Sequence, residues 1–526
     1  MMEILKLDLQ KTEPDQPSEG EVRFQVALLA SLACVAASFV ARFVFDAPLV
    51  PELLAHFIFA VLPISVIEVG VGLLGPFAKK LAFVGCVVLY FLALLGAAVA
   101  FIRFSERFKD RAPSLALSTG FAGLAWAVAV FLVVPALGGG LVGRYLRQGP
   151  VFTSLALLAV FAVYVIALRL TSALYIGRPE IARANNYRLS RRRLVRGIGY
   201  AVVAVAAYEV ASSFLTTWWR SGSGKVKNGN GVFPNIDGLA LEVTPTDDFY
   251  VVSKNPFDPQ VDSARWVLEV AGLVQTPLTL TYEDIKGLPA VEQYATLQCI
   301  DNKVGGDLIG NASWRGVRLR DVLERAGLKE GVVDVVLRAS DDYRDSIPLD
   351  RALADGTILA YEMNGEPLTP AHGYPLRLIV PGIYGMKNVK WIRRIEPVNF
   401  DLKGYWQARG WDDRAEYKTT SRIDVAEYNV DGAATLAGMA FAGDRGVSGA
   451  EVSTDGGKTW TPAEIKPAAS QYSWVLWHKE WSPVEAGDYT VVVRATDGTG
   501  VTQTDRRTPV APDGASGRHS VGLTVD

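Results

Sequence analysis

The sequence predicts a multi-domain protein with an N-terminal bundle of six transmembrane helices, a central α+β domain and a C-terminal all-β sandwich of the immunoglobulin-like type. Half of the 526 residues are hydrophobic and only 21% are charged, and the long uncharged runs are confined to residues 24–217. A glycine-rich polar stretch follows these runs, and from about residue 421 the pattern is entirely β. We therefore predict a membrane region at 1–220, a flexible linker at 221–232, an α+β domain at 233–420 and an all-β domain at 421–526.

The membrane region is predicted from the length of its apolar runs. A bilayer core about 30 Å thick requires roughly 20 apolar residues of helix. Six segments meet this requirement, at about 24–45, 52–75, 81–102, 114–137, 151–175 and 194–217. Arginine-rich connections at 103–111 and 178–193 favour the cytoplasmic side for those loops. The sequence therefore predicts a multi-pass protein of the cell membrane, with everything after residue 217 on the extracytoplasmic side.

The membrane region contains one candidate export motif and a few ionisable residues that are candidates for function. Ser190–Arg196 precedes the last apolar run and resembles a twin-arginine export signal; a cytoplasmic arginine anchor is the alternative. His56 is the one histidine in the spans and no methionine lies there, so no haem is predicted. Glu68, Arg169 and Glu209 are ionisable residues within the spans; they are candidates for function, or for side chains that reach to the interface.

Charge and cysteine content exclude several classes of protein. The formal net charge of -2 offers no basic footprint for nucleic acid. Three cysteines (Cys34, Cys86 and Cys299), two of them inside apolar runs, exclude a disulfide scaffold, a four-cysteine iron–sulfur site and a CxxCH haem attachment.

The soluble half begins with mixed secondary structure. Without a regular alternation of strand and helix, the pattern favours an α+β domain over a doubly wound fold. The expected elements are strands at 267–270, 335–337 and 376–380, a helix that begins near Tyr282, and a helix at 317–326 that ends at Gly327.

The last hundred or so residues have the turn spacing of a sandwich. A hairpin with Asp-Gly at its tip is expected at 451–460, and further strands at 474–477 and 489–494. Trp460, Trp477 and Trp481 are interpreted as core rather than binding residues.

Cys299 is the only cysteine outside the membrane region. A lone cysteine is usually a small buried hydrophobe. Here the thiol ends a short apolar run and is followed by Ile-Asp-Asn302-Lys-Val-Gly-Gly, a loop that can present a side chain to a ligand. A Cys–His nucleophile with His372 as base is the competing chemistry, although no cysteine-protease signature surrounds Cys299.

A second cluster of candidate residues lies downstream. His372, Arg377, Lys387 and Lys390 fall within nineteen residues that also contain several glycines. Arginine can donate two hydrogen bonds to one anionic group, and lysine supplies a point charge. Glycine lets backbone N–H groups approach a ligand closely. This combination suits an anionic ligand. A solvated basic loop beside a strand is the alternative.

Together the two clusters resemble the sulfite oxidase family of molybdenum enzymes. The similarity rests on Leu297-Gln298-Cys299, Asn302, Trp314–Val317, Ala360–Pro367 and His372–Gly382. The all-β tail looks like the family's dimerisation domain, most clearly at Ser453–Trp460. The resemblance covers about residues 233–526 and leaves the membrane region unmatched.

The resemblance implies a molybdenum–molybdopterin cofactor whose one protein ligand is the Cys299 thiolate. It also implies that Cys299, Lys303 and Tyr343 are catalytic. The cofactor-binding residues implied by the same match are Tyr250, Ser253, Lys254, Asn255, Asp341, His372, Arg377, Lys387, Asn388, Val389 and Lys390.

The function expected from this resemblance is oxygen-atom transfer on a small substrate of the sulfite or S-oxide type, by a membrane-anchored oxidoreductase. Electrons would pass to or from a separate partner such as a cytochrome or a quinone-linked protein, and a homodimer is implied. Sulfite oxidases place arginines where this chain has Lys254 and Lys303, which leaves a sulfoxide or N-oxide reductase as an alternative. A cofactor-free, membrane-tethered binding protein is the alternative from another class.

Overall fold

The computed structural model describes residues 19–62, 77–105, 114–175 apart from 145 and 147, 233–255, 258–429 and 432–525. The chain divides into two compact units, Met1–Gly222 and Ser223–Asp526. Each unit is described by itself.

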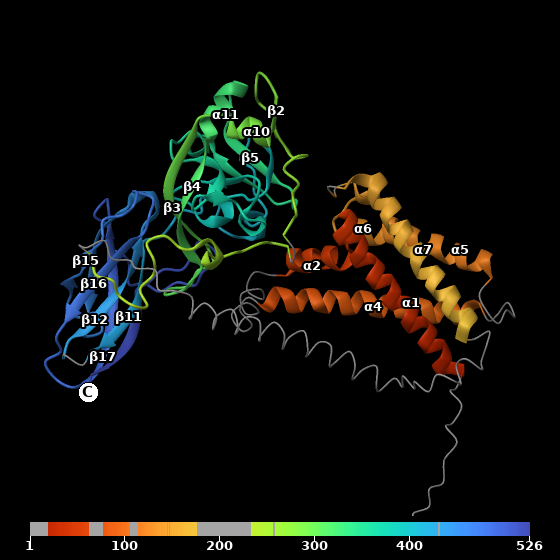
Figure 1. The fold of residues 1–526 in the computed structure, drawn as a ribbon, viewed down its shortest axis with the longest axis horizontal. Coiled ribbons are helices and arrows are strands. Elements are labelled where there is room, and N and C mark those ends of the chain that lie inside the picture. Colours follow the sequence, from red (N-terminus) through yellow and green to blue (C-terminus); the bar gives the residue numbers. More distant parts are fainter. Residues whose placement is uncertain are drawn as a thin grey trace, which may run out of the picture. The chain divides into compact units, whose positions relative to one another are not determined.

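The first unit is helical (Figure 1). Its described elements are α1 (Glu19–Phe45), α2 (Val50–Val61), α4 (Phe77–Ser105), α5 (Leu115–Val128), a π-helical turn η2 (Ala129–Val133), α6 (Val134–Ala136), a 3₁₀ turn η3 (Leu141–Gly143) and α7 (Gly149–Tyr175). Helix α1 packs against α4 and α7, and α5 packs against α7.

The described residues contain four helices long and apolar enough to cross a membrane, not clearly the six that were predicted. They are Gly20–Phe45, Leu81–Ser105, Leu115–Ala136 and Gly149–Leu174. The segment predicted at 52–75 is represented by the 12-residue α2, and residues 63–76 are outside the described part. The segment at 194–217 and the twin-arginine-like motif also lie outside the described residues.

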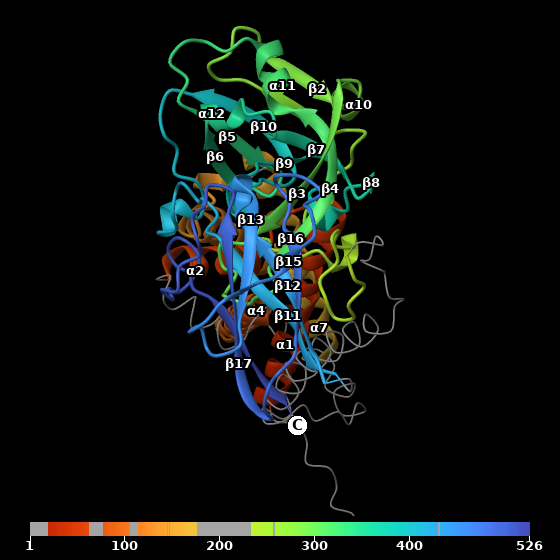
Figure 2. The same cartoon turned by 90° about the vertical axis from the view of Figure 1, so that its left-hand side faces the viewer.

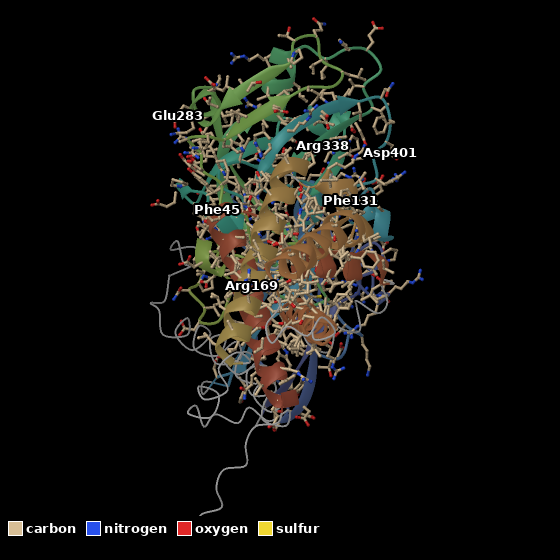
Figure 3. All side chains as sticks on the ribbon, turned by 90° about the vertical axis from the view of Figure 1, so that its right-hand side faces the viewer. Phe45, Phe131, Arg169, Glu283, Arg338 and Asp401 are labelled. Carbon is tan, nitrogen blue, oxygen red and sulfur yellow. The ribbon has the colours of Figure 1, made fainter. Side chains whose placement is uncertain are left out.

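The surface of this helical unit is apolar. Most of the large hydrophobic side chains that are exposed in the described residues belong to it; Phe45 and Phe131, for example, are 65% and 46% exposed (Figure 3). Arg169 is half-buried on α7, whereas Glu68 and Glu209 lie outside the described residues. An apolar outer surface of this kind fits contact with lipid.

The second unit begins with an α+β part built on two sheets. The first is a mixed sheet in the order β2–β1–β10–β5–β6, where β1 runs parallel to β10 and the other pairs are antiparallel. The second has the order β3–β4–β7–β8, with β9 paired to β7. The strands are β1 (Val267–Val270), β2 (Leu278–Thr281), β3 (Ala290–Gln298), β4 (Ile309–Arg318), β5 (Asp334–Ala339), β6 (Arg344–Pro348), β7 (Ile358–Met363), β8 (Glu366–Pro367), β9 (Arg377–Ile379) and β10 (Ile392–Val398).

This part also contains short helices and 3₁₀ turns. They are η4 (Thr246–Asp248), α10 (Tyr282–Lys286), α11 (Leu319–Ala326), α12 (Leu349–Ala352), η5 (Pro370–His372), η6 (Gly385–Lys387) and η7 (Gln407–Arg409). The apolar face of α11 packs against the first sheet in one core, and the helix ends at Gly327, whose φ of 68° favours glycine. The α+β prediction and its expected strands and helices are confirmed, with α11 starting two residues later than predicted.

The last part of the second unit, here called the β domain (residues 416–525), has two antiparallel sheets (Figure 2). One has the order β11–β12–β16–β15 and the other β14–β13–β17–β18. The elements are β11 (Thr420–Tyr428), β12 (Ala434–Phe441), η8 (Gly443–Arg445), β13 (Val447–Ser453), β14 (Thr461–Pro462), β15 (Glu464–Ile465), β16 (Val475–Trp481), β17 (Gly487–Asp497) and β18 (His519–Val525).

The two β-domain sheets share one hydrophobic core, to which both contribute. The predicted hairpin is present, since Val452 pairs with Thr461. Trp477 is fully buried, as predicted for a core residue. Trp460 is half-buried and lies under the Arg494 guanidinium, 4.2 Å from its ring centroid. The all-β prediction is confirmed; the immunoglobulin-like topology and the domain boundaries stay predictions.

Candidate active site

The thiol of Cys299 lies where β3 ends and a tight loop begins. The Cys299 N–H donates to the Leu308 carbonyl at 2.9 Å, which closes the loop at its base. The Asn302 N–H donates to the Cys299 carbonyl at 3.0 Å, and the Asn302 Oδ1 accepts from the Leu308 N–H at 3.0 Å. Cys299 is half-buried, so its side chain is held by the backbone around it and is still reachable.

The structure brings Cys299 together with the segment that carries the second cluster. Burial raises the pKa of Tyr250 well above its ordinary value; the neighbouring Cys299 and Tyr417 raise it further, and Arg377 opposes them. A side chain at Gly385 would lie 2.6 Å from the Tyr250 hydroxyl and 3.3 Å from the Gln298 carbonyl. Glycine is therefore required at 385 because Tyr250 and the end of β3 approach the backbone there.

Arg377 is a buried cation that does not use all of its hydrogen-bond donors within the described residues. It is 5% exposed, its guanidinium carbon lies 4.8 Å from the Trp314 ring centroid, and its Nη1 donates to the His372 carbonyl at 3.0 Å. Its Nε is buried and has no hydrogen-bond partner among the described residues. Burial lowers the Arg377 pKa to about 10. A buried cationic donor without an acceptor is costly, and an anionic group would satisfy it.

His372 and Lys390 lie beside Arg377. The His372 Nε2 is 2.9 Å from the Thr246 carbonyl, to which it donates. Burial, followed by the nearby Arg377 charge, lowers the His372 pKa to about 4. The Lys390 Nζ donates to the Ser253 hydroxyl at 3.0 Å and to the Ala371 carbonyl at 2.9 Å. Four residues predicted to bind a cofactor therefore gather here: Ser253, His372, Arg377 and Lys390.

A second group links the residues after Ser253 to the β5–β6 turn. The Lys254 Nζ donates to the Asn255 Oδ1 at 2.9 Å. The Asn255 amide donates to the carbonyl and to the carboxylate of Asp341, at 3.3 and 3.4 Å. Asp341 in turn accepts from the Tyr343 N–H at 3.0 Å. Side chains predicted from separate parts of the sequence thus form one connected polar set.

The three residues Lys387, Asn388 and Val389 serve the protein itself. The Lys387 Nζ donates to the Asp345 Oδ1 at 3.1 Å, to the Ser346 carbonyl at 2.9 Å and to the Asp413 Oδ1 at 3.5 Å, which uses its three protons. The Asn388 Oδ1 accepts from the Val380 N–H at 2.7 Å, and Val389 is 1% exposed. The side chains of these residues hold the loop in place; a ligand could meet only their backbone.

The two remaining catalytic candidates differ in exposure. Lys303 is exposed on the loop that follows Cys299. The Tyr343 hydroxyl is within hydrogen-bonding distance of the Met386 carbonyl at 2.7 Å and of the Asp345 Oδ2 at 3.1 Å. Tyr417, which receives the Gln298 N–H at 3.2 Å and lies close to Cys299, was not predicted because no local motif marks it.

Two family matches cover most of the second unit. Residues 255–406 match the oxidoreductase molybdopterin-binding domain, and residues 416–510 match the Mo-co oxidoreductase dimerisation domain. The chain is 37% identical over 171 residues to the uncharacterized oxidoreductase YuiH of Bacillus subtilis, a match that covers 32% of this chain and 84% of that protein.

The chain belongs to the sulfite oxidase family of molybdopterin-dependent oxidoreductases.

Other comparisons agree with this family assignment. The chain is 33% identical over 275 residues to the sulfite oxidase of Arabidopsis thaliana, covering 42% of this chain and 70% of that one. The sulfane dehydrogenase SoxCD from Paracoccus pantotrophus has the same fold, with a TM-score of 0.51 and 23% identity over 59% of this chain and 92% of that one. The chain spans 36% of a barley nitrate reductase and 58% of a mitochondrial sulfite oxidase that it also matches.

The site suits the cofactor that the family implies. Among the described residues no three His, Cys, Asp or Glu side chains gather into a metal site. A molybdenum held by the dithiolene of a pterin needs one soft protein ligand, which the half-buried Cys299 provides. The cofactor's phosphate would meet the Arg377 Nε, for which the described residues offer no acceptor.

The state of His372 leads to a pH prediction for the protein without cofactor. Its pKa of about 4 in the folded protein is below the ordinary value of 6.5, so between these pH values the unfolded chain binds the extra proton. Stability is therefore expected to fall as the pH decreases from about 6.5 to about 4. Thermal unfolding at a series of pH values measures this, and His372→Gln should flatten the profile. An unchanged profile in the variant would contradict the assignment.

Proposed function

We propose that the chain is a membrane-anchored, molybdenum cofactor-dependent oxidoreductase that catalyses oxygen-atom transfer on a small substrate of the sulfite or S-oxide type. The observation that carries the proposal is the half-buried Cys299 thiol beside Tyr250, in the same site as the buried Arg377, whose Nε has no acceptor within the described part of the chain. When bound, the cofactor supplies two-electron oxygen-atom chemistry, and the protein binds, orients and shields it.

The residues around the site take separate roles in this proposal. Cys299 ligates the metal, and Arg377 with His372 and Lys390 holds the cofactor's anionic end. A neutral His372 that donates its Nε2–H to Thr246 carries no proton on Nδ1. For Nδ1 to donate to an anion it must take up a proton, so the arrival of the anion would raise the His372 pKa.

The helical unit supports the location that we propose. Four described helices have the length and apolar character of membrane spans. We place the catalytic unit on the extracytoplasmic side, as the arginine-rich loops predict. A separate electron-transfer protein, such as a cytochrome or a quinone-linked protein, would exchange single electrons with the site. The match to the dimerisation domain favours a homodimer.

The direction and substrate can be tested on the purified full chain in detergent. Elemental analysis is expected to find about one molybdenum per chain. The oxidised centre, followed by its absorbance, is then offered sulfite, and the reduced centre is offered methionine sulfoxide or trimethylamine N-oxide. Reduction by sulfite supports an oxidase, and reoxidation by an S-oxide or N-oxide supports a reductase. Absence of molybdenum from protein made in a cofactor-producing host would refute the proposal.

A reductase of neutral oxides is the second candidate, and one contact favours it. The Lys254 ammonium is already engaged by the Asn255 Oδ1 at 2.9 Å and lies 5.6 Å from the Tyr405 ring centroid. A lysine engaged in this way binds an oxyanion more weakly than an arginine, whose guanidinium donates two parallel hydrogen bonds.

Lys303 distinguishes the two candidates. If the substrate is an anion such as sulfite, Lys303→Ala should raise its KM about tenfold with kcat within about twofold, since one charge-assisted hydrogen bond is lost. Lys303→Arg should retain the low KM. Steady-state kinetics check this, with Lys458→Ala on the exposed β13–β14 turn as the matched control. An unaltered KM for sulfite in Lys303→Ala would remove Lys303 from the substrate site.

A further inference from the structure

Strand β3, which leads into Cys299, is completed on its outer edge by the β domain. Strand β3 is at the end of its sheet and pairs with β4 on one side only. On the other side the Thr296 N–H donates to the Tyr472 carbonyl at 3.0 Å. The Ser470 hydroxyl donates to the Tyr294 carbonyl at 2.5 Å, and the Trp474 N–H donates to the Thr296 hydroxyl at 2.9 Å.

The same domain also reaches the loop beyond Cys299. The Arg422 Nη1 donates to the Gly306 carbonyl at 2.9 Å, while its Nε is fixed by the Asp424 Oδ1 at 2.5 Å. The imidazole of His519 packs directly on Gly305, where an added Cβ would lie 2.3 Å from its Cδ2. The His519 ring is itself fixed, because its Nδ1 accepts from the Ile423 N–H at 3.0 Å.

These contacts fall on the part of the loop that has least stiffness of its own. Gly305 and Gly306 are adjacent, and Gly305 has a φ of +76°. Glycine loses more conformational freedom on ordering than any other residue, so contacts from outside add to the restraint given by the loop's own hydrogen bond from the Gly306 N–H to the Lys303 carbonyl at 2.9 Å. Both contacts come from residues of the β domain, and Lys303 lies two positions before Gly305.

We propose that Arg422 and His519 are positioning residues for the Cys299–Leu308 loop, so that the β domain of the same chain fixes Lys303 beside the reaction centre. This gives the domain a role in cis, separate from pairing with a second copy. The role of Lys303 in substrate binding rests on the proposed function, whereas the restraint on the loop does not.

The first test measures hydrogen exchange of loop amides in the full-length protein. Arg422→Ala and His519→Ala should each speed exchange of the 302–308 amides about tenfold, as loss of one restraining hydrogen bond or packing contact implies. Arg494→Ala is the matched control, since its Nε also pairs with a carboxylate of the β domain, Glu451, at 2.8 Å. Loop exchange as slow in both folded variants as in the control would overturn the proposal.

A pair of variants tests the His519 contact independently of protein stability. Gly305→Ala should disturb the loop, both by strain at positive φ and by collision with the imidazole. Adding His519→Ala relieves the collision and leaves the strain, so the double variant should recover part of the slow exchange. Strict additivity of the two changes would show that they do not interact and would contradict the contact.

Kinetics with sulfite as the probe connect the restraint to Lys303. Arg422→Ala should raise the KM for sulfite about tenfold, with kcat within about twofold and molybdenum content unchanged, because the cation is displaced and the ligand is not. A fall in kcat with no change in KM would overturn the positioning role. If sulfite is not turned over by the parent protein, the proposed function fails on that point, and the exchange measurements still decide the restraint.

Discussion

Replacement of Cys299 by serine is expected to reduce turnover more than about 100-fold, beyond the loss typical of residues that only support a metal ligand. A serine hydroxyl is a hard, protonated group at neutral pH and does not replace a thiolate on molybdenum. The fold should survive, since the loop is closed by backbone hydrogen bonds of residue 299 and by the Asn302 side chain. His372, Arg377 and Lys390, which we propose to hold the cofactor's anionic end, are also unchanged.

Three measurements together check this expectation. Turnover should be lost, the pterin content should remain near one per chain, and the thermal unfolding temperature should change little. Cys86→Ser, a buried cysteine of α4 in the other unit, is the control for loss of a thiol as such. Activity of Cys299→Ser close to that of the parent protein would end the assignment of this residue as the ligand.

Lys387→Met is expected to produce the largest loss of stability. The Lys387 side chain is 3% exposed and its partner Asp345 is fully buried, so the variant leaves a carboxylate without its charge partner. Breaking one side of a buried pair costs about 3–5 kcal/mol. Burial already raises the pKa of Asp345, against the opposing effect of Lys387, so removal of the lysine should raise that pKa further.

The penalty should therefore depend on pH. At pH 7 Asp345 must either remain charged or take up a proton at a cost, whereas at lower pH the proton is supplied by the solvent and the penalty shrinks. Urea unfolding followed by tryptophan fluorescence at pH 7 and pH 5 measures both. Lys403→Met is the control, because Lys403 is 52% exposed in its pairs with Asp401 and Asp413, and exposed pairs contribute about 0–1 kcal/mol. Equal effects of the two substitutions would contradict the special role of burial.

Local signals explain what could be predicted from the sequence. Strand β1 occupies 267–270 as predicted because alternation of apolar residues is a short-range pattern, and α11 ends where Gly327 permits a positive φ. The length of the apolar runs predicted the four long helices that the structure describes in the first unit. The gathering of Ser253, His372, Arg377 and Lys390 followed from the resemblance, and no periodicity would have revealed it.

Contacts across long sequence distances could not be predicted in this way. Lys387 is paired with Asp345, 42 positions earlier, and no pattern in the sequence marks such a pair. Arg422 approaches Gly306 from 116 positions away, and Tyr417 approaches Gln298 from 119. The last two contacts depend on how two domains pack, and the Lys387–Asp345 pair depends on packing within one domain; composition and spacing encode neither.

The edge of β3 also constrains the order of events during synthesis. Residues 470–474, which complete that edge, and His519, which packs on the loop, are translated after both sheets of the α+β part. A nascent chain that has extruded only the first sheets holds its cysteine on an unfinished strand. Cofactor insertion should accordingly follow synthesis of the β domain, and chains that stop before residue 470 should accumulate without metal.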